Sequence, residues 1–257
     1  MPDTIAEKQL ASQVPKFLSS GDTALCVEFG DRVDRKVSAR VLALAGRLEA
    51  AAIAGIVELV PTFRSLMIHY DPAVLGQKEL IAQLQPLLAG LDATEAPGRH
   101  WLIPACYDPS IAPDLEEVAS RTGLSPDEVV QRHSATTYHV YMLGFLPGYP
   151  YLGDLPPELE LPRRDNPRTK VPAGSIAIAT TLTSIYVLES PGGWHVIGRT
   201  PARLWDLRRE SPVLLRAGDK VVFQAVPIEE YEELARKAEL GEFRLDPQAD
   251  TNYGGHA

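Results

Sequence analysis

The sequence predicts a two-domain α+β protein, and three observations support this. In the N-terminal part, strand and helix patterns follow the order β-α-β-β-α-β of a small ferredoxin-like sandwich. In the C-terminal part, short strands separated by turn residues indicate a barrel or a sandwich. Thr, Pro and Gly between residues 93 and 99 mark a linker. We therefore expect a flexible lead-in at 1–15, a ferredoxin-like domain at 16–96, a β-barrel domain at 97–240 and a flexible tail at 241–257.

The N-terminal elements follow from apolar runs and from one helical repeat. Apolar residues recur every three or four positions over residues 33–48, which is one face of a helix ended by Gly55. A second helix is predicted over 77–88, where Pro86 kinks it or marks its last turn. Strands are predicted at residues 24–29, 56–60, 65–70 and 101–107.

The C-terminal elements begin with two short helices. Residues 114–122 form the first, ended by Gly123. Ser125, Pro126 and Glu128 predict a capping box at the start of the second, which stops near His133. Strands are predicted at 138–143, 175–179, 183–188, 194–198 and 220–226, and a last helix at 228–240.

Composition narrows the classes of partner. The 257 residues are 45% hydrophobic, enough for a sizeable core, and the net charge is −9, which disfavours nucleic acid and anionic membranes. Cys26 and Cys106 lie in apolar, strand-like segments, which predicts buried thiols and a cytoplasmic location. The N-terminus lacks an apolar signal core, and no run is long enough to span a bilayer, so we expect no membrane association.

Three stretches rich in Gly and Pro also contain aromatic residues: 144–153, 167–175 and 189–201. A flexible linker would instead have Ser and charged residues between the glycines. The combination predicts rigid loops that pack on a β core and present a binding surface.

The third stretch contains the best candidate site. Ser190-Pro191-Gly192-Gly193 is expected to form a tight turn whose N–H groups bind an anion, and Arg199 can pair with a carboxylate or phosphate. The alternative is a structural turn, with Arg199 bound to an acid such as Glu189 or Asp206.

Two further groups of residues are candidates. Arg168 and Lys170 offer a second positive rim, for which a solvated loop is the alternative. A set of aromatic residues lines an apolar pocket or, equally well, fills the barrel core. These residues are Tyr141, Phe145, Tyr149 and Tyr151.

The sequence assigns no catalytic residue and no metal site. It contains none of the metalloprotease, P-loop, nucleophile-elbow or zinc-cysteine patterns. Its six histidines are scattered, and each is expected to have a surface or core role. Ser190 and His195 are close in sequence, but spacing does not place them in contact, so a catalytic triad is not expected.

The loop motifs resemble the KipI / allophanate hydrolase subunit 1 family. The resemblance extends over the chain and is carried by long motifs: residues 133–134, 138–141, 144–152, 167–175, 189–194 and 197–201. It implies an N-terminal ferredoxin-like domain and a C-terminal cyclophilin-like β-barrel, a fold that does not itself imply prolyl isomerase activity.

The common bacterial member of this family is the B subunit of the ATP-dependent 5-oxoprolinase. The resemblance therefore implies a subunit that helps to cleave 5-oxo-L-proline to L-glutamate with ATP. It also implies a C-type cyclophilin-like partner and a third subunit, with no activity in this chain alone. Two alternatives remain: a regulatory protein that inhibits a sensor histidine kinase, or an accessory subunit of a urea-type carboxylase or allophanate hydrolase system.

One segment departs from the family pattern. Where the family has Ile-Ala-Gly-Gly-Gln-Thr-Gly-Ile-Tyr-Pro, this chain has residues 178–187, with Thr180-Thr181-Leu182 in place of Gly-Gly-Gln. Leu182 can neither donate nor accept a hydrogen bond as that Gln would. The exchange points to a different lactam, amide or urea-like substrate, or to binding without catalysis.

Overall fold

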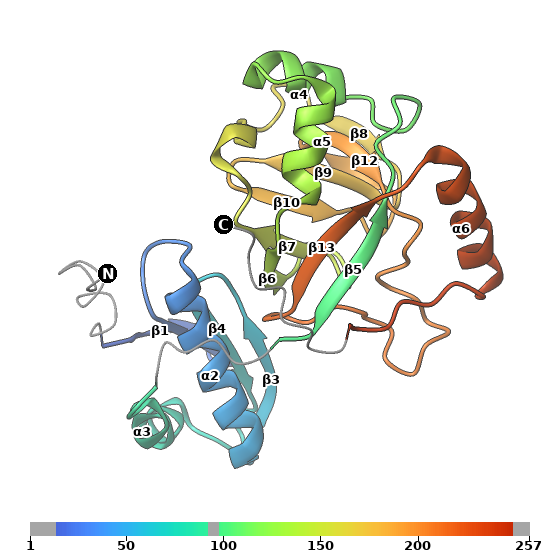
Figure 1. The fold of residues 1–257 in the computed structure, drawn as a ribbon. Coiled ribbons are helices and arrows are strands. Elements are labelled where there is room, and N and C mark those ends of the chain that lie inside the picture. Colours follow the sequence, from blue (N-terminus) through green and yellow to red (C-terminus); the bar gives the residue numbers. More distant parts are fainter. Residues whose placement is uncertain (1–13, 92–97, 249–257) are drawn as a thin grey trace. The chain divides into compact units, whose positions relative to one another are not determined.

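The computed structural model describes residues 14–91 and 98–248, which belong to two compact units, Met1–Pro97 and Gly98–Ala257 (Figure 1). The predicted α+β architecture is confirmed, with a helix-and-strand unit followed by a unit built on a barrel-like sheet. Most of the predicted lead-in, residues 1–13, lies outside the described residues. None of the helices described is both long enough and apolar enough to cross a bilayer.

The N-terminal unit is a four-stranded antiparallel sheet with two helices. Its strand order is β1-β2-β4-β3. The β2-α2-β3 crossover encloses β4, as in a ferredoxin-like split βαβ unit. The elements are β1 (Lys16–Ser20), β2 (Ala24–Glu28), α2 (Arg35–Ala51), β3 (Ile56–Pro61), β4 (Ser65–Tyr70) and α3 (Gln77–Leu88).

The fourth strand of this sheet is not the one that the sequence predicted. The predicted strand 101–107 is β5 (His100–Ala105), which belongs to the C-terminal unit and pairs in parallel with β13 (Lys220–Ala225). Its expected place beside β2 is taken by β1, which forms a hairpin with β2. The sequence pattern does not predict β1 as a strand, because most of its residues are exposed and polar or charged.

Helix α2 begins two residues later than its apolar repeat suggested. The Asp34 side chain caps it by accepting from the N–H groups of Lys36 and Val37. Val33 therefore precedes the helix and is 47% exposed. The helix also ends before Gly55, because Ala52 adopts the left-handed conformation at its C-terminus.

The C-terminal unit is a nearly closed seven-stranded barrel (Figure 1). Its strand order is β12-β9-β10-β7-β6-β13-β5, and an antiparallel bridge between Cys106 and Arg199 joins the two ends. The remaining strands of this sheet are β6 (Tyr138–Leu143), β7 (Pro150–Gly153), β9 (Ser175–Ala179), β10 (Leu182–Ile185) and β12 (His195–Arg199). A separate pair comprises β8 (Arg168–Val171) and β11 (Ser190–Gly192).

Helices surround this barrel: α4 (Leu115–Thr122), α5 (Pro126–Ser134), the 3₁₀ turn η1 (Pro157–Leu159) and α6 (Ile228–Leu240). The predicted capping box of α5 is confirmed, since Ser125 N–H donates to Glu128 and Glu128 N–H donates to the Ser125 hydroxyl. The prediction of a flexible tail is wrong for residues 243–248. Phe243 and Leu245 pack on the barrel core, and Gln248 pairs with His100.

His133 lies inside the barrel core. Its ring is fully buried, stacks on Phe223 with centroids 4.7 Å apart, and hydrogen-bonds to the Tyr107 hydroxyl at 2.8 Å and to Thr183 Oγ1 at 2.9 Å. Burial lowers the pKa of His133 to about 3. The expected core role is thus met by this histidine. Of the two cysteines, which are both free, Cys106 is buried as expected and Cys26 only half-buried.

The buried His133 predicts a stability that depends on pH. Its folded pKa lies below the unfolded value, so its contribution is complete above about pH 6.5 and is lost as the pH falls towards 3. Within this window, we expect the free energy of unfolding to fall by about 1.4 kcal/mol for each unit by which the pH is lowered, because the unfolded chain binds a proton at His133 that the folded chain does not. Urea denaturation of His133→Gln at pH 4 to 7 should show a shallower pH slope than wild type. An unchanged slope in His133→Gln would contradict the prediction.

Candidate functional site

Arg199 ends β12 beside an open cavity. Its main chain forms the bridge to Cys106 with two hydrogen bonds of 2.8 Å, which fixes where its side chain starts. The Nε atom donates to the carbonyl of Ala173 at 2.9 Å. Among the residues that the structure describes, nothing accepts a hydrogen bond from its two terminal nitrogens.

The cavity beside Arg199 has a volume of about 430 Å³, within the range of small-molecule sites. It lies between the loop after β12 and α6, and Tyr231 of α6 lines it together with Arg199. Burial raises the pKa of Tyr231, and the positive charge of Arg199 opposes this shift. A guanidinium with a free edge and a nearby phenol can hold a carboxylate or a phosphate.

The two acids that the sequence analysis named as possible partners of Arg199 pair with other residues. Glu189 pairs with Lys170 at 3.2 Å, and Asp206 pairs with Arg208 at 2.6 Å. The hydrogen bonds from Arg208 hold the pKa of Asp206 well below its usual value. Neither acid therefore pairs with Arg199, so the ion pair of the structural alternative is not formed.

The predicted glycine turn has a different form. Residues 190–192 are strand β11, paired with β8. Gly192 is required for packing, because a Cβ there would overlap the Tyr186 hydroxyl. The Gly193 carbonyl accepts from the Arg164 N–H, and Ser190 Oγ is buried without a hydrogen-bond partner among the described residues.

Strand β12 separates this glycine segment from Arg199. Gly193 precedes the strand and Arg199 ends it, and the five residues of β12, at roughly 3.3 Å per residue, by themselves span about 13 Å between their end Cα atoms. The structure therefore does not combine Gly192, Gly193 and Arg199 into one anion site. Arg199 lines a cavity of its own, and anion binding there stays a prediction.

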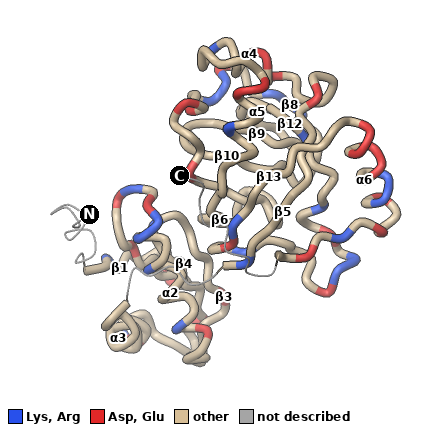
Figure 2. Tube along the Cα trace, viewed as in Figure 1, with Lys and Arg blue, Asp and Glu red and all other residues tan. Residues whose placement is uncertain are grey.

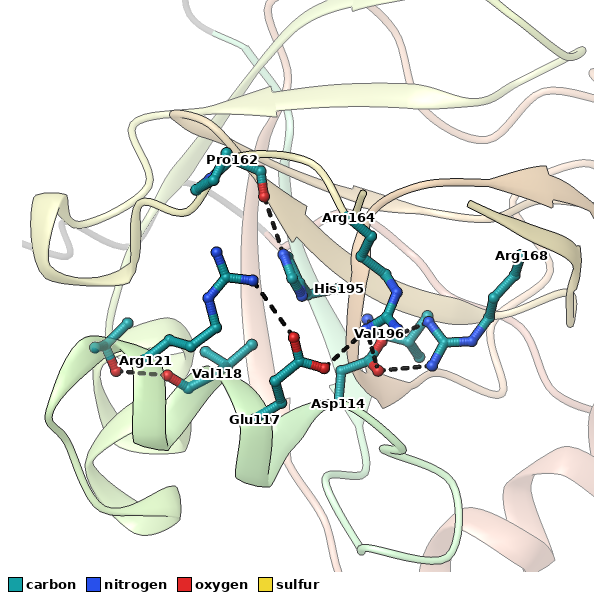
Figure 3. Close-up of polar contacts among 10 residues, drawn as sticks. Asp114, Glu117, Val118, Arg121, Pro162, Arg164, Arg168, His195 and Val196 are labelled. Atoms are coloured by element: carbon teal, nitrogen blue, oxygen red, sulfur yellow. Dashed lines mark hydrogen bonds and ion pairs between the residues drawn. The ribbon is translucent and has the colours of Figure 1, made fainter. Parts of the chain in front are cut away.

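Arg168 is neither an open rim nor a solvated side chain. It donates two hydrogen bonds of 2.7 and 2.6 Å to the carboxylate of Asp114, which is 2% exposed (Figure 3). Arg164 donates to Asp114 at 2.8 Å and to Glu117 at 3.0 Å. The fourth donor to Asp114 is the N–H of Val196 on β12, at 2.7 Å. Asp114 thus ties the start of α4 to β8 and β12, a role that its sequence neighbourhood did not reveal.

The predicted aromatic wall is not one surface. The Tyr141 side chain is buried, and its hydroxyl donates to Asp154 at 3.3 Å. Phe145 is 62% exposed and stands edge-on to Tyr149 with centroids 5.4 Å apart. Phe145 also has φ +70°, a conformation that costs energy for a bulky residue.

The segment that departs from the family pattern forms the β9–β10 hairpin. Ala179 pairs with Leu182, so Thr180 and Thr181 are the two loop residues. Thr180 has φ +53°, which glycine adopts without strain. Leu182 is half-buried and packs on the cluster that contains Tyr149, Tyr186 and Trp194. The exchange therefore replaces a polar side chain with an apolar one against these aromatic rings.

The described residues contain no group of His, Cys, Asp and Glu side chains suited to a metal ion. They also contain no Ser190–His195 hydrogen bond. His195 donates from Nε2 to the carbonyl of Pro162 at 3.0 Å, and its buried Nδ1 has no partner there (Figure 3). The candidate site is therefore a cavity beside Arg199 in which no described residue forms a pair of nucleophile and base.

The sequence matches the family described as carboxyltransferase domain, subdomain C and D, over residues 15–215. It is 37% identical to the 5-oxoprolinase B subunit of Bacillus subtilis (strain 168), covering 82% of this chain and 92% of that protein. It is 41% identical to the protein of that name in Escherichia coli O157:H7, covering 79% and 92%. The chain belongs to this family of carboxyltransferase C and D subdomains.

Some of the similar proteins are longer than this chain. Urea amidolyase of Saccharomyces cerevisiae is 26% identical over 90% of this chain, but that match is 14% of its own length. The solved protein TTHA0988 is 40% identical with a TM-score of 0.72, covering 79% of this chain and 40% of that one. Kluyveromyces lactis urea carboxylase, at 23% identity and a TM-score of 0.76, has the same fold over 91% of this chain and 24% of its own.

Loss of the Asp114 carboxylate is expected to destabilise the C-terminal unit strongly. Asp114→Asn leaves Arg164 and Arg168 without their shared buried acid, so we expect a loss of about 3–5 kcal/mol in urea denaturation. Glu117→Gln is the matched control, because Glu117 is exposed and, among the described residues, pairs with Arg164 and Arg121 alone; it should cost less than about 1 kcal/mol. Equal losses in the two variants would contradict the role of Asp114.

The strained hairpin predicts a stabilising substitution. Thr180→Gly removes a β-branched residue from a left-handed conformation and should raise stability by about 0.5–1 kcal/mol. Thr181→Gly is the control: its φ is not positive, so added freedom in the unfolded chain should lower stability by a similar amount. Thermal unfolding followed by circular dichroism distinguishes them. A Thr180→Gly variant that melts no higher than wild type would show that the hairpin is not strained.

Proposed function

We propose that the chain is the B-type subunit of an ATP-dependent 5-oxoprolinase, which converts 5-oxo-L-proline to L-glutamate. The observation that carries this proposal is the similarity to two 5-oxoprolinase B subunits at 37% and 41% identity, each matched over 92% of its length. Similarity over nearly the whole of each relative supports a common role rather than a shared domain alone.

The geometry of the Arg199 cavity suits this substrate. 5-Oxoproline carries a carboxylate beside a five-membered ring amide, and the free edge of Arg199 can bind that carboxylate. The amide is a stable lactam, so its opening is coupled to ATP. Transfer of the γ-phosphoryl group of ATP to the amide oxygen releases ADP and makes the C–N bond cleavable. Water then adds to the same carbon, and loss of inorganic phosphate and of the amine leaves the second carboxylate.

The proposal includes partner subunits. The cavity holds no paired nucleophile and base among the described residues, so this chain is expected to bind and orient substrate but not to act alone. In longer relatives, this fold is 14% to 40% of the chain. We therefore expect the missing parts to come from a C-type cyclophilin-like partner and from a third subunit. The two free thiols fit a cytoplasmic complex.

A urea-type system is the second candidate. Its support is the similarity to urea amidolyase over 90% of this chain, together with the apolar Leu182 beside the aromatic cluster. In that case, the chain would be an accessory subunit acting on a urea-like compound rather than on a lactam.

The experiment is to purify the chain together with the C-type partner and the third subunit, and to measure glutamate formation and 5-oxoproline-dependent ATP hydrolysis. We expect activity only in the assembled complex. Arg199→Ala should lower kcat/KM for 5-oxoproline by at least about tenfold, because a charge-assisted hydrogen-bonded pair is lost. Arg121→Ala, an exposed arginine on α4, should leave kcat/KM unchanged.

Three other outcomes would redirect the proposal. An assembled complex that ignores 5-oxoproline but hydrolyses ATP with urea-like compounds would favour the second candidate. A chain that fails to assemble and instead inhibits a sensor histidine kinase would replace both candidates by a regulatory role. Full activity in Arg199→Ala would move the substrate site away from this cavity.

A further inference from the structure

A second cavity, of about 500 Å³, lies on the same side of the barrel unit as α6. It is formed by the loop after β12 and by the segment that follows α6, where basic and acidic residues are interspersed (Figure 2). Arg203 and Asp206 line both this cavity and the one at Arg199. Four arginines line the second cavity: Arg203, Arg208, Arg209 and Arg244.

One of these arginines has a structural role. Arg208 forms a two-pronged pair with Asp206 and donates to the carbonyls of Ala238 and Glu239 at the end of α6, both at 3.2 Å. These bonds hold the loop against the C-terminus of α6, where the helix dipole favours a cation. Arg208 and Asp206 therefore neutralise each other, and Asp206 does not balance the charge of the other arginines in the cavity.

Arg209 is a partly buried cation that pairs with no acid among the described residues. One terminal nitrogen donates to the carbonyls of Arg203 and Pro212, at 2.8 and 3.1 Å. Its Nε atom is buried, and no acceptor among the described residues lies within hydrogen-bond distance. Burial lowers the pKa of Arg209. A buried donor on a charged group costs free energy unless a ligand or water satisfies it.

The other two arginines present free side chains to the same cavity. Arg203 and Arg244 are exposed, and their guanidinium groups form no hydrogen bond or ion pair with any residue that the structure describes. Glu210 and Asp246 also line the cavity but make no ion pair with these arginines there. Three arginines therefore face two carboxylates, and none of the three is paired.

We propose that this cavity binds the phosphate groups of a ligand. Guanidinium groups match the geometry of phosphate oxygens, and Arg209 Nη1, which donates no hydrogen bond to a described residue, can donate to a phosphate in the cavity. The cavity has the size of a small-molecule site and adjoins the Arg199 cavity through Arg203. The identity of the ligand rests on the proposed function: in a 5-oxoprolinase the ligand would be ATP, bound next to the lactam. Inorganic phosphate is the other ligand that offers the same phosphate oxygens.

Calorimetric titration of the full chain without partners tests this inference. The ligands are ATP, tripolyphosphate and inorganic phosphate, with citrate as a carboxylate comparison. We expect saturable binding of at least one phosphate compound that weakens with rising salt, and weaker binding of citrate. Equal binding of ATP and tripolyphosphate would assign recognition to the phosphates alone, and a preference for ATP would add a contact to the nucleoside.

Matched variants make the assignment specific. Arg203→Gln and Arg244→Gln carry the test, because they remove charge without removing a described hydrogen bond, and each should weaken binding about tenfold. Glu210→Gln should strengthen binding, since it removes a repulsive charge from the same cavity. Arg236→Gln, on α6 but outside the cavity, should bind like wild type.

The inference and the proposed function fail in different ways. Absence of phosphate binding, or binding that Arg203→Gln and Arg244→Gln leave unchanged, would overturn the inference even if the assembled complex opens 5-oxoproline. Binding that depends on these arginines would sustain it even if the complex shows no 5-oxoprolinase activity. Citrate binding as tight as that of the phosphates would also overturn it, because the site would then be a general anion site.

Discussion

The pairing of Cys106 with Arg199 determines where the candidate site lies. These residues follow β5 and end β12, the two outer strands of the seven-stranded sheet, and their mutual hydrogen bonds turn that sheet into a barrel. The approach is close enough that a Cβ at Gly198 would lie 2.8 Å from the Cys106 carbonyl oxygen. The Arg199 side chain therefore starts at a fixed point on the rim, beside the loop that leads to α6.

Asp114 extends this constraint along β12. Its N–H donates to the Val196 carbonyl and its carboxylate accepts from the Val196 N–H, so the start of α4 is held against the strand at two points (Figure 3). Because Asp114 is buried, its charge needs the two arginines that donate to it. This network occupies Arg168, so both proposed ligand sites depend on arginines elsewhere on the barrel.

The arginines of the barrel unit divide by whether a carboxylate lies within reach. Arg164, Arg168 and Arg208 are paired with buried or partly buried acids and hold loops in place. Arg199, Arg203 and Arg244 have no acid partner among the described residues and line two adjoining cavities. Unpaired guanidinium groups in cavities are what a substrate carboxylate and a phosphate require, which gives the two proposed sites one electrostatic basis.

Local patterns in the sequence determined much of the secondary structure. The bounds of β4, α3, β6, β9 and α6 follow from apolar periodicity and from the residues that stop helices and strands, and the capping box of α5 follows from the spacing of Ser125 and Glu128. Motifs in the loops also indicated the family, and residue chemistry selected Arg199. The sequence predicts these features because each depends on residues that lie close together in the chain.

Only the tertiary structure decided which strands share a sheet and which charges meet. The sequence pattern of residues 100–105 predicts a strand but does not show which unit the strand belongs to. Its pairing with β13, more than a hundred residues away, assigns it to the barrel. Arg168 donates to Asp114, which lies 54 residues earlier in the chain. Gly192 is needed because the Tyr186 hydroxyl occupies the place of a Cβ atom. Contacts of this kind depend on the path of the closed sheet, so no local pattern encodes them.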